Sequence, residues 1–320
     1  MFLKSITQLA APGGTRARLS ILIFHRVLAA QDPLFPEEAD DRRFDEVLQW
    51  VRRWYRVMPL DEAVDALRED RLPARAMAIT FDDGYADNAT RAVPILQRHG
   101  MTATFFVATS FLDGGRMWND TVIESLRRCT ADSVDLGPVG LAPMPLRNAA
   151  ERRAAAMATL RVTKYLPADE RHQQVQRVQH ICAPGALPDD LMMQTDQVRG
   201  LLRAGMQVGA HTRTHPILSR IPDDQARHEI QRSKEDLQDL LGRPVTLFAY
   251  PNGKPGVDYA PQHVAMVRES GFSAAVSTSA GASARDSDFH QLPRFTPWDQ
   301  QAWRFGVRLL RNTRSAGARC

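Results

Sequence analysis

The chain has few cysteines and no long apolar run, and each absence excludes a class of protein. Its 320 residues include three cysteines, which are far apart and form no Cys-x-x-Cys pair. A disulfide framework or a structural zinc knuckle is therefore not expected, and reduced thiols are the simpler interpretation. No stretch approaches the roughly 20 apolar residues of a membrane-spanning helix. Residues 1–12 also lack the uninterrupted apolar block of a secretory signal.

Positive charge is concentrated at one end of the chain. The formal net charge is +4 at pH 7, yet residues 294–320 alone contain six arginines and a single aspartate. The rest of the chain is therefore close to neutral. Nucleic-acid binding requires a basic surface with supporting chemistry, so it is not expected. The absence of a signal favours the cytoplasm or the cytoplasmic face of a membrane.

Short β-rich apolar runs alternate with amphipathic segments, which is typical of one α/β domain. Buried strands are predicted at 19–24, 76–81, 103–107, 206–210, 245–250 and 273–277, with a brief strand at 56–60. Helices are predicted at 44–55, at 61–67 with Asp61 as cap, at 88–99 and at 223–241. This order predicts a parallel sheet or barrel.

The segment 121–202 interrupts this rhythm, because it is mostly helical and polar and contains several prolines. We interpret it as an inserted helical region that either shapes a substrate groove or covers the barrel. The predicted organisation is an N-terminal extension at 1–18, a barrel at 19–300 that contains this insertion, and a basic helix or tail at 301–320.

Two adjacent carboxylates, Asp82 and Asp83, stand where a buried strand ends and the chain turns at Gly84. Ligands of parallel α/β folds bind at the C-terminal ends of strands. Two neighbouring anions raise the pKa of one of them unless a cation is present. A bound metal resolves this conflict, because one carboxylate can ligate it while the other stays free as a base. A solvated acidic turn or a helix cap is the alternative interpretation.

Two histidines four residues apart, His211 and His215, also follow a strand. Their side chains can converge on one ion, and two histidines with one carboxylate leave an open coordination position, as in a catalytic zinc site. Ordinary hydrogen-bonding histidines are the alternative. A third segment, FAYPNG at 248–253, runs from a strand end into a turn whose N–H groups can form half of an oxyanion hole; a plain turn is its alternative.

Together, TFDDG at 80–84 and HTRTH at 211–215 resemble the polysaccharide deacetylase family, whose hallmarks are Thr-Phe-Asp-Asp-Gly and His-(Ser/Thr)-x-x-His. The resemblance spans roughly residues 19–299, and LIFHRV at 22–27 resembles the first strand of a bacterial branch. It implies a distorted (β/α) barrel, TIM-like, of about seven parallel strands. It also implies a metal-dependent hydrolase that removes N-acetyl groups from the amino-sugars of a polysaccharide, such as an exopolysaccharide, or of a glycan precursor.

The resemblance also implies roles for single residues. Asp82 is the catalytic base, and Asp83, His211 and His215 hold a divalent metal, most simply Zn²⁺, with Co²⁺ or Ni²⁺ as alternatives. The partner is an N-acetylated glycan or a lipid-linked saccharide. The backbone N–H of Tyr250 is our candidate donor to the oxyanion.

The sequence departs from the family in two places. Ala249 stands where the third motif often has an arginine, and Arg294 is the candidate to orient Asp82 instead. The late Leu-x-Leu-His motif is absent, so the usual general-acid histidine is missing. His25 is the candidate replacement because it ends a core strand. His290 is the second candidate, although a simple loop histidine is its plainer interpretation.

Aromatic residues outside these motifs suggest further surfaces. Trp118 and Trp298 are candidates to line a glycan groove, although core packing is the commoner role of tryptophan. A helix predicted at 301–313 has Trp303, Val307 and Leu310 on one face, with arginines around it. It either packs on the barrel or makes peripheral membrane contact.

Three other functions remain open on the sequence. The first is deformylation or deacylation of a lipid-linked amino-sugar by the same mechanism. The second is a catalytically silent carbohydrate-binding relative, against which the four intact motif residues argue. The third is a zinc-dependent amidase that acts on non-sugar amides.

Overall fold

The structure is a computed structural model that describes residues 7–183 and 185–320. The interpretation of residues 1–12 as lacking a secretory signal falls partly on residues 1–6, outside the described residues. The remainder of the predicted extension lies against the barrel. Ala11 and Ala17 are buried, and the carbonyl of Ala11 accepts a hydrogen bond of 2.8 Å from the N–H of Arg75.

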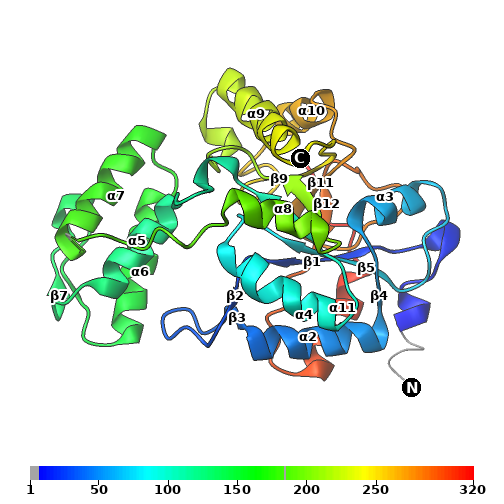
Figure 1. The fold of residues 1–320 in the computed structure, drawn as a ribbon, viewed down its shortest axis with the longest axis horizontal. Helices are drawn as coiled ribbons and strands as arrows, with labels where there is room; N and C mark the ends of the chain where they lie inside the picture. The colour runs from blue at the N-terminus through cyan, green and yellow to red at the C-terminus, as the bar shows by residue number, and fades with distance from the viewer. Residues whose placement is uncertain (1–6, 184) are drawn as a thin grey trace.

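Seven parallel strands form a nearly closed barrel (Figure 1). In spatial order they are β1 (Ser20–Phe24), β5 (Ala76–Phe81), β6 (Thr104–Val107), β9 (Gln207–Ala210), β10 (Leu247–Ala249), β11 (Ala274–Ala280) and β12 (Leu292–Arg294). Phe295, next after β12, donates to the carbonyl of Ile21 at 2.8 Å and accepts from the N–H of Ile23 at 3.1 Å. These two bonds join the last strand to the first. The predicted distorted (β/α) barrel is confirmed.

The strands are buried on both faces, and their side chains alternate between two clusters. Met77, Ile79 and Phe81 of β5 belong to the large cluster shared with the surrounding helices. Ala76 and Ala78, which point the other way, belong to a second cluster shared with helix α3 (Leu60–Arg68). Because both of these alternating sets of side chains are buried, the strands read as continuous apolar runs in the sequence.

Helices cover the barrel. They are α2 (Asp41–Trp54), α3 (Leu60–Arg68), α4 (Val93–Arg98), α8 (Thr195–Arg203), α9 (Asp223–Leu241), α10 (Pro261–Glu269) and α11 (Ala302–Asn312). All but α8 and α10 lie close to the positions predicted for them. The prediction that Asp61 caps a helix is wrong, because α3 starts one residue earlier, after Pro59. The helix predicted from residue 88 begins as a π-helical turn, η2 (Asn88–Ala92).

Short elements complete the described chain. The strands are β2 (Val27–Leu28) paired with β3 (Ala39–Asp40), β4 (Arg56–Val57) paired with β5, and β7 (Ser133–Val134) paired with β8 (Met144–Pro145). The 3₁₀ turns are η1 (Gly14–Arg16), η3 (Thr109–Phe111), η4 (Gly137–Val139) and η5 (Leu218–Arg220).

A helical lobe stands beside the barrel and is formed by α5 (Trp118–Arg128), α6 (Ala149–Thr163) and α7 (Ala168–Cys182) (Figure 1, left). Its buried apolar residues form a cluster of their own, which includes Val122, Leu126, Ala155 and Val178. The prediction extended the insertion to residue 202. In the structure α8 instead packs into the main cluster through Val198 and Leu201, so the lobe ends with α7.

The predicted C-terminal helix is α11, and it packs on the barrel. The ring of Phe305 lies 5.6 Å from that of Trp50 and 5.9 Å from that of Phe295. The predicted stripe points the other way, since Trp303 is 58% exposed and Val307 is 38% exposed. None of the helices within residues 7–183 and 185–320 has the length and hydropathy needed to cross a membrane.

Candidate active site

The chemistry-bearing residues follow three barrel strands at the same end of the barrel. His25 follows β1, Asp82 and Asp83 follow β5, and His211 and His215 follow β9. Parallel strands place their C-terminal ends on one rim, which is why segments far apart in the chain meet there. All five residues line one cavity of about 420 Å³, which we call the catalytic cavity. Its other lining residues are Trp118, Asn119, Met157, Leu160, Arg161, Lys164, Asn252 and Thr278.

Three of these side chains form a group that fits a divalent metal. Oδ1 of Asp83 lies 3.4 Å from Nε2 of His211 and 3.3 Å from Nε2 of His215. One ligand atom from each of the three residues lies within 4.8 Å of the others. Tetrahedral zinc with bonds of about 2.1 Å separates its ligand atoms by about 3.4 Å, so the two shorter spacings suit such an ion. The donor set of two imidazoles and one carboxylate is that of a catalytic site with an open position.

The ligand side chains are oriented in advance by contacts with the barrel. Nδ1 of His211 lies 2.8 Å from the carbonyl oxygen of Ala249, so this nitrogen carries the proton and Nε2 faces Asp83 with its lone pair. Burial lowers the pKa of His215 to about 4, which keeps this imidazole neutral at neutral pH. Burial alone would raise the pKa of Asp83, but its close contacts with the imidazoles of His211 and His215 lower it well below its ordinary value. A neutral imidazole and an ionised carboxylate are the forms that ligate a metal.

The backbone at Asp83 adopts a sparsely populated conformation. Its φ is +77°, and the N–H of Gly84 donates to the carbonyl of Asp82 at 3.0 Å, as in a γ-turn. Gly84 has a φ of +91°, and a Cβ added there would lie 3.1 Å from Cγ1 of Val107. Glycine is therefore required after the carboxylate pair. The strained turn points the two adjacent carboxylates at different partners.

Asp82 is held by a buried arginine. Nη1 and Nη2 of Arg294 donate to its two carboxylate oxygens, each at 2.7 Å, and both side chains are almost fully buried. Nε of Arg294 donates to the carbonyl of Ser277 at 2.8 Å, which fixes the guanidinium. Burial would raise the pKa of Asp82, but the charge of Arg294 outweighs it, so the pKa lies below its ordinary value. The carboxylate is thus ionised at neutral pH and held in one orientation.

The two candidate histidines for proton donation lie in different places. His25 is exposed at the end of β1 and lines the catalytic cavity. Its backbone carbonyl accepts a hydrogen bond of 2.8 Å from Nδ2 of Asn88. His290 does not line this cavity. Its Nε2 lies 3.0 Å from the carbonyl of Phe272. The structure therefore brings only the first of the two candidates to the reacting groups.

The prediction for Tyr250 needs a correction. Its N–H donates to the carbonyl of Val276 at 3.2 Å and continues the sheet ladder between β10 and β11, so it is not free to bind an oxyanion. Pro251 has no N–H. The next residue, Asn252, lines the catalytic cavity, and within the described chain its N–H has no hydrogen-bond acceptor. The sequence could have indicated Asn252. The N–H of a residue at a strand end is used by the sheet, and the proline that follows has no N–H, so Asn252 carries the first free N–H.

The lobe contributes residues that the sequence patterns did not single out. Trp118 was a candidate for the groove and does line the catalytic cavity, whereas Met157 and Arg161 of α6, and Lys164 just after it, were missed. The exposure of Met157, which is 43%, was not visible in the sequence, where α6 reads as a plain polar helix. One side of the cavity is therefore made by the lobe and the other by the barrel rim.

Comparisons with known proteins agree with this geometry. The chain matches the polysaccharide deacetylase family over residues 69–275. The Bacillus subtilis (strain 168) protein YxkH, which is named a polysaccharide deacetylase, is 20% identical over 280 residues that cover 87% of this chain and 71% of the relative.

Two solved structures share the fold. A Streptococcus pyogenes deacetylase, PplD, in complex with acetate has a TM-score of 0.61 and 19% identity, with 93% of this chain and 99% of that chain covered. IcaB from Ammonifex degensii has a TM-score of 0.58 and 20% identity, with 92% and 98% covered. The family match covers more than half of the chain, and this protein therefore belongs to the polysaccharide deacetylase family.

Proposed function

We propose that the protein is a metal-dependent hydrolase that removes N-acetyl groups from the amino-sugars of a glycan. One observation carries the proposal. A metal-fitting group of three side chains and an ionised carboxylate that is held by an arginine face the same cavity. The two carboxylates involved, Asp82 and Asp83, are adjacent residues of one turn. This arrangement separates the ligand, Asp83, from the base, Asp82.

The protein's own residues account for the proton transfers. Asp83, His211 and His215 would hold a divalent cation, most simply Zn²⁺, and such a cation polarises a water and the acetyl carbonyl. Asp82 accepts the proton of the attacking water, since Arg294 keeps it ionised and oriented.

Two further groups complete the reaction. The N–H of Asn252 is the backbone group that we assign as donor to the developing oxyanion, because Asn252 lines the cavity and this N–H has no acceptor within the described chain. His25, which reaches the cavity from the end of β1, donates a proton to the departing amine. The products are acetate and a saccharide with a free amino group.

The test is acetate release by purified protein from N-acetylglucosamine oligomers, before and after chelation and after readdition of zinc. Release that requires metal and is lost in Asp82→Asn supports the proposal. Asp239→Asn, an exposed residue of α9, is the matched control and should keep full activity. Formate release from N-formylated sugars without acetate release would favour the deformylase. Oligomer binding without any metal-dependent product would favour a silent binding protein.

Peripheral membrane contact through α11 belongs to the same proposal and would bring the enzyme to lipid-linked saccharides at the cytoplasmic face. The outward face of α11 carries Trp303 and Val307, and Arg304 and Arg311 are exposed beside them. Apolar and cationic groups together favour an anionic bilayer surface. Co-sedimentation with anionic vesicles at low salt tests this contact, with neutral vesicles and a Trp303→Ala variant as controls. If the protein stays in the supernatant to the same extent with anionic and with neutral vesicles, the membrane contact is rejected.

A further inference from the structure

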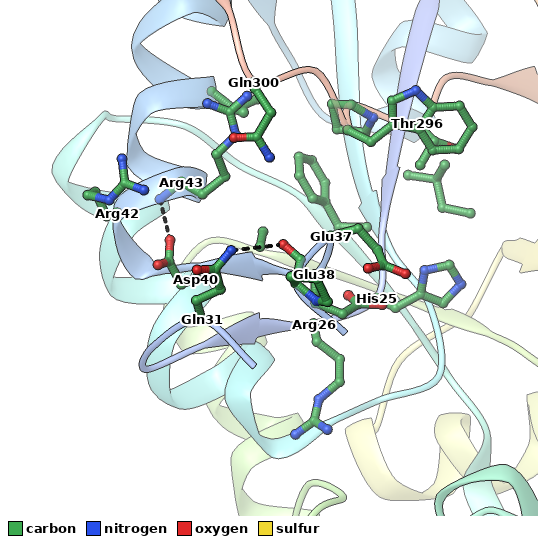
Figure 2. A pocket seen from close by; sticks show the side chains of 17 residues that line it. His25, Arg26, Gln31, Glu37, Glu38, Asp40, Arg42, Arg43, Thr296 and Gln300 are labelled. Atoms are coloured by element: carbon green, nitrogen blue, oxygen red, sulfur yellow. Dashed lines mark hydrogen bonds between the residues drawn. The ribbon is translucent and has the colours of Figure 1, made fainter. Parts of the chain in front are cut away.

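A second cavity of about 280 Å³ adjoins the catalytic cavity at the seam where the last barrel strand meets the first (Figure 2). We call it the seam cavity. It is lined by the end of β1, by the loop that leads to β3, by the start of α2 and by the segment that follows Phe295. His25 lines both cavities, so the two adjoin at the candidate proton donor.

The lining of the seam cavity combines apolar surface with several polar and charged side chains. Figure 2 shows His25 at one end and Arg42 and Arg43 at the other, with Gln300 on a third side. Gln31 and Glu38 also line it. Hydrogen-bond donors and acceptors around a small cavity suit a ligand that carries several hydroxyl groups.

Trp298 lies at the mouth of this cavity and is 63% exposed, yet its position is fixed. The guanidinium of Arg308 lies 4.8 Å from the centroid of its ring. Arg308 also donates to Oδ2 of Asp299 at 2.7 and 2.9 Å and to the carbonyl of Thr296, on either side of the tryptophan. A large apolar ring that is both exposed and held from behind offers a platform for stacking.

We propose that the seam cavity binds the sugar residue next to the one that is deacetylated, with Trp298 stacked on the apolar face of that ring. The inference rests on the proposed function and deepens it. Once an acetamide is seated at Asp82, a saccharide chain that continues past His25 enters the seam cavity. The preferred substrate is therefore an oligomer or polymer, and Trp298 is the residue that distinguishes it from a single amino-sugar.

The experiment uses the metal-loaded full chain and compares acetate release from the methyl glycoside of N-acetylglucosamine with release from its β-1,4- and β-1,6-linked tetramers. In Trp298→Ala, the ratio of kcat/KM for the better tetramer to that for the monosaccharide should fall roughly tenfold, mainly through a higher KM. Trp298→Phe should restore most of the ratio. Trp303→Ala, an equally exposed tryptophan that does not line the seam cavity, is the matched control.

Two results would overturn the inference. One is an unchanged ratio in Trp298→Ala, and the other is a wild-type enzyme that hydrolyses monosaccharide and tetramers equally well. If no saccharide releases acetate, the proposed function fails, and tetramer binding measured by calorimetry then decides the inference alone. If the tetramer binds Asp82→Asn, and binds Asp82→Asn/Trp298→Ala about tenfold more weakly, the seam cavity is supported as a saccharide site. Equal binding by these two variants, or no binding by either, refutes it.

Discussion

Replacing Arg294 by methionine should destabilise the protein strongly, because it leaves a buried carboxylate without its counter-charge. The side chain of Arg294 is fully buried and that of Asp82 is 3% exposed, and two hydrogen bonds of 2.7 Å join them. Removing one partner of a buried ion pair costs about 3–5 kcal/mol of the free energy of unfolding. Methionine fills a similar apolar volume, so most of this cost comes from the unpaired charge.

The loss should depend on pH in a defined direction. In the wild type the pKa of Asp82 lies below its ordinary value, so the stability from this group is present above about pH 4 and is lost as the pH falls through the folded-state pKa. In Arg294→Met, burial raises the folded-state pKa above that of the unfolded chain. The variant therefore loses stability as the pH rises from about 4, and the gap between the two proteins widens towards pH 7.

Chemical denaturation at pH 5 and pH 7 measures both effects. Arg285→Met is the matched control, since Arg285 is 63% exposed and pairs with Asp70 at 2.7 Å on the surface, where such pairs contribute about 0–1 kcal/mol. The double variant Asp82→Asn/Arg294→Met should recover most of the lost stability, because it removes the unpaired charge. If it is no more stable than Arg294→Met, or if Arg294→Met resembles the control, the reasoning is refuted.

Three further results are expected. His215→Ala removes a ligand atom, so zinc affinity by chelator competition should fall more than about 100-fold; unchanged affinity would disprove its role as a ligand. His25→Ala should lower kcat by roughly 10²–10⁴-fold at unchanged metal content, measured by elemental analysis; near-normal turnover would exclude it as the general acid. Gly84→Ala places a side chain at a φ of +91° beside Val107, so the free energy of unfolding should fall by about 1–3 kcal/mol; a denaturation midpoint equal to that of the wild type would contradict this.

The strands could be predicted from the sequence because their signal is local. The strand predicted at 76–81 matches β5, since a strand buried on both faces has no solvent-facing position to interrupt its apolar run. The faces of α11 could not be assigned in the same way. Trp303 and Val307 satisfy helical spacing as well as Phe305 and Leu309 do. Which pair is buried depends on neighbours distant in the chain, such as the rings of Trp50 and Trp54.

The candidate site was predictable to the extent that motifs fixed it. The sequence named Arg294 as a candidate partner of Asp82, but their bidentate contact joins residues 212 positions apart and follows from barrel closure. The role assigned to the N–H of Tyr250 did not survive, because ladder bonding at a strand end depends on the neighbouring strand. The contribution of α6 could not be predicted, since nothing local in a polar helix indicates which of its faces meets a cavity formed by distant segments of the chain.

The helical lobe has an apolar core separate from that of the barrel, so on the proposed function the groups that contact the saccharide and those that hydrolyse it belong to separately packed parts of the chain. The groups to which we assign the hydrolysis sit on barrel loops, whereas Trp118, Arg161 and Lys164 reach the catalytic cavity from the lobe, which has its own apolar cluster. A chimera that exchanges α5 to α7 for the corresponding helices of a relative would keep the hydrolytic residues in register. Such an exchange would change the saccharides that are admitted while the bond that is cleaved stays the same, so the lobe is the part of this chain to diversify in an engineering library.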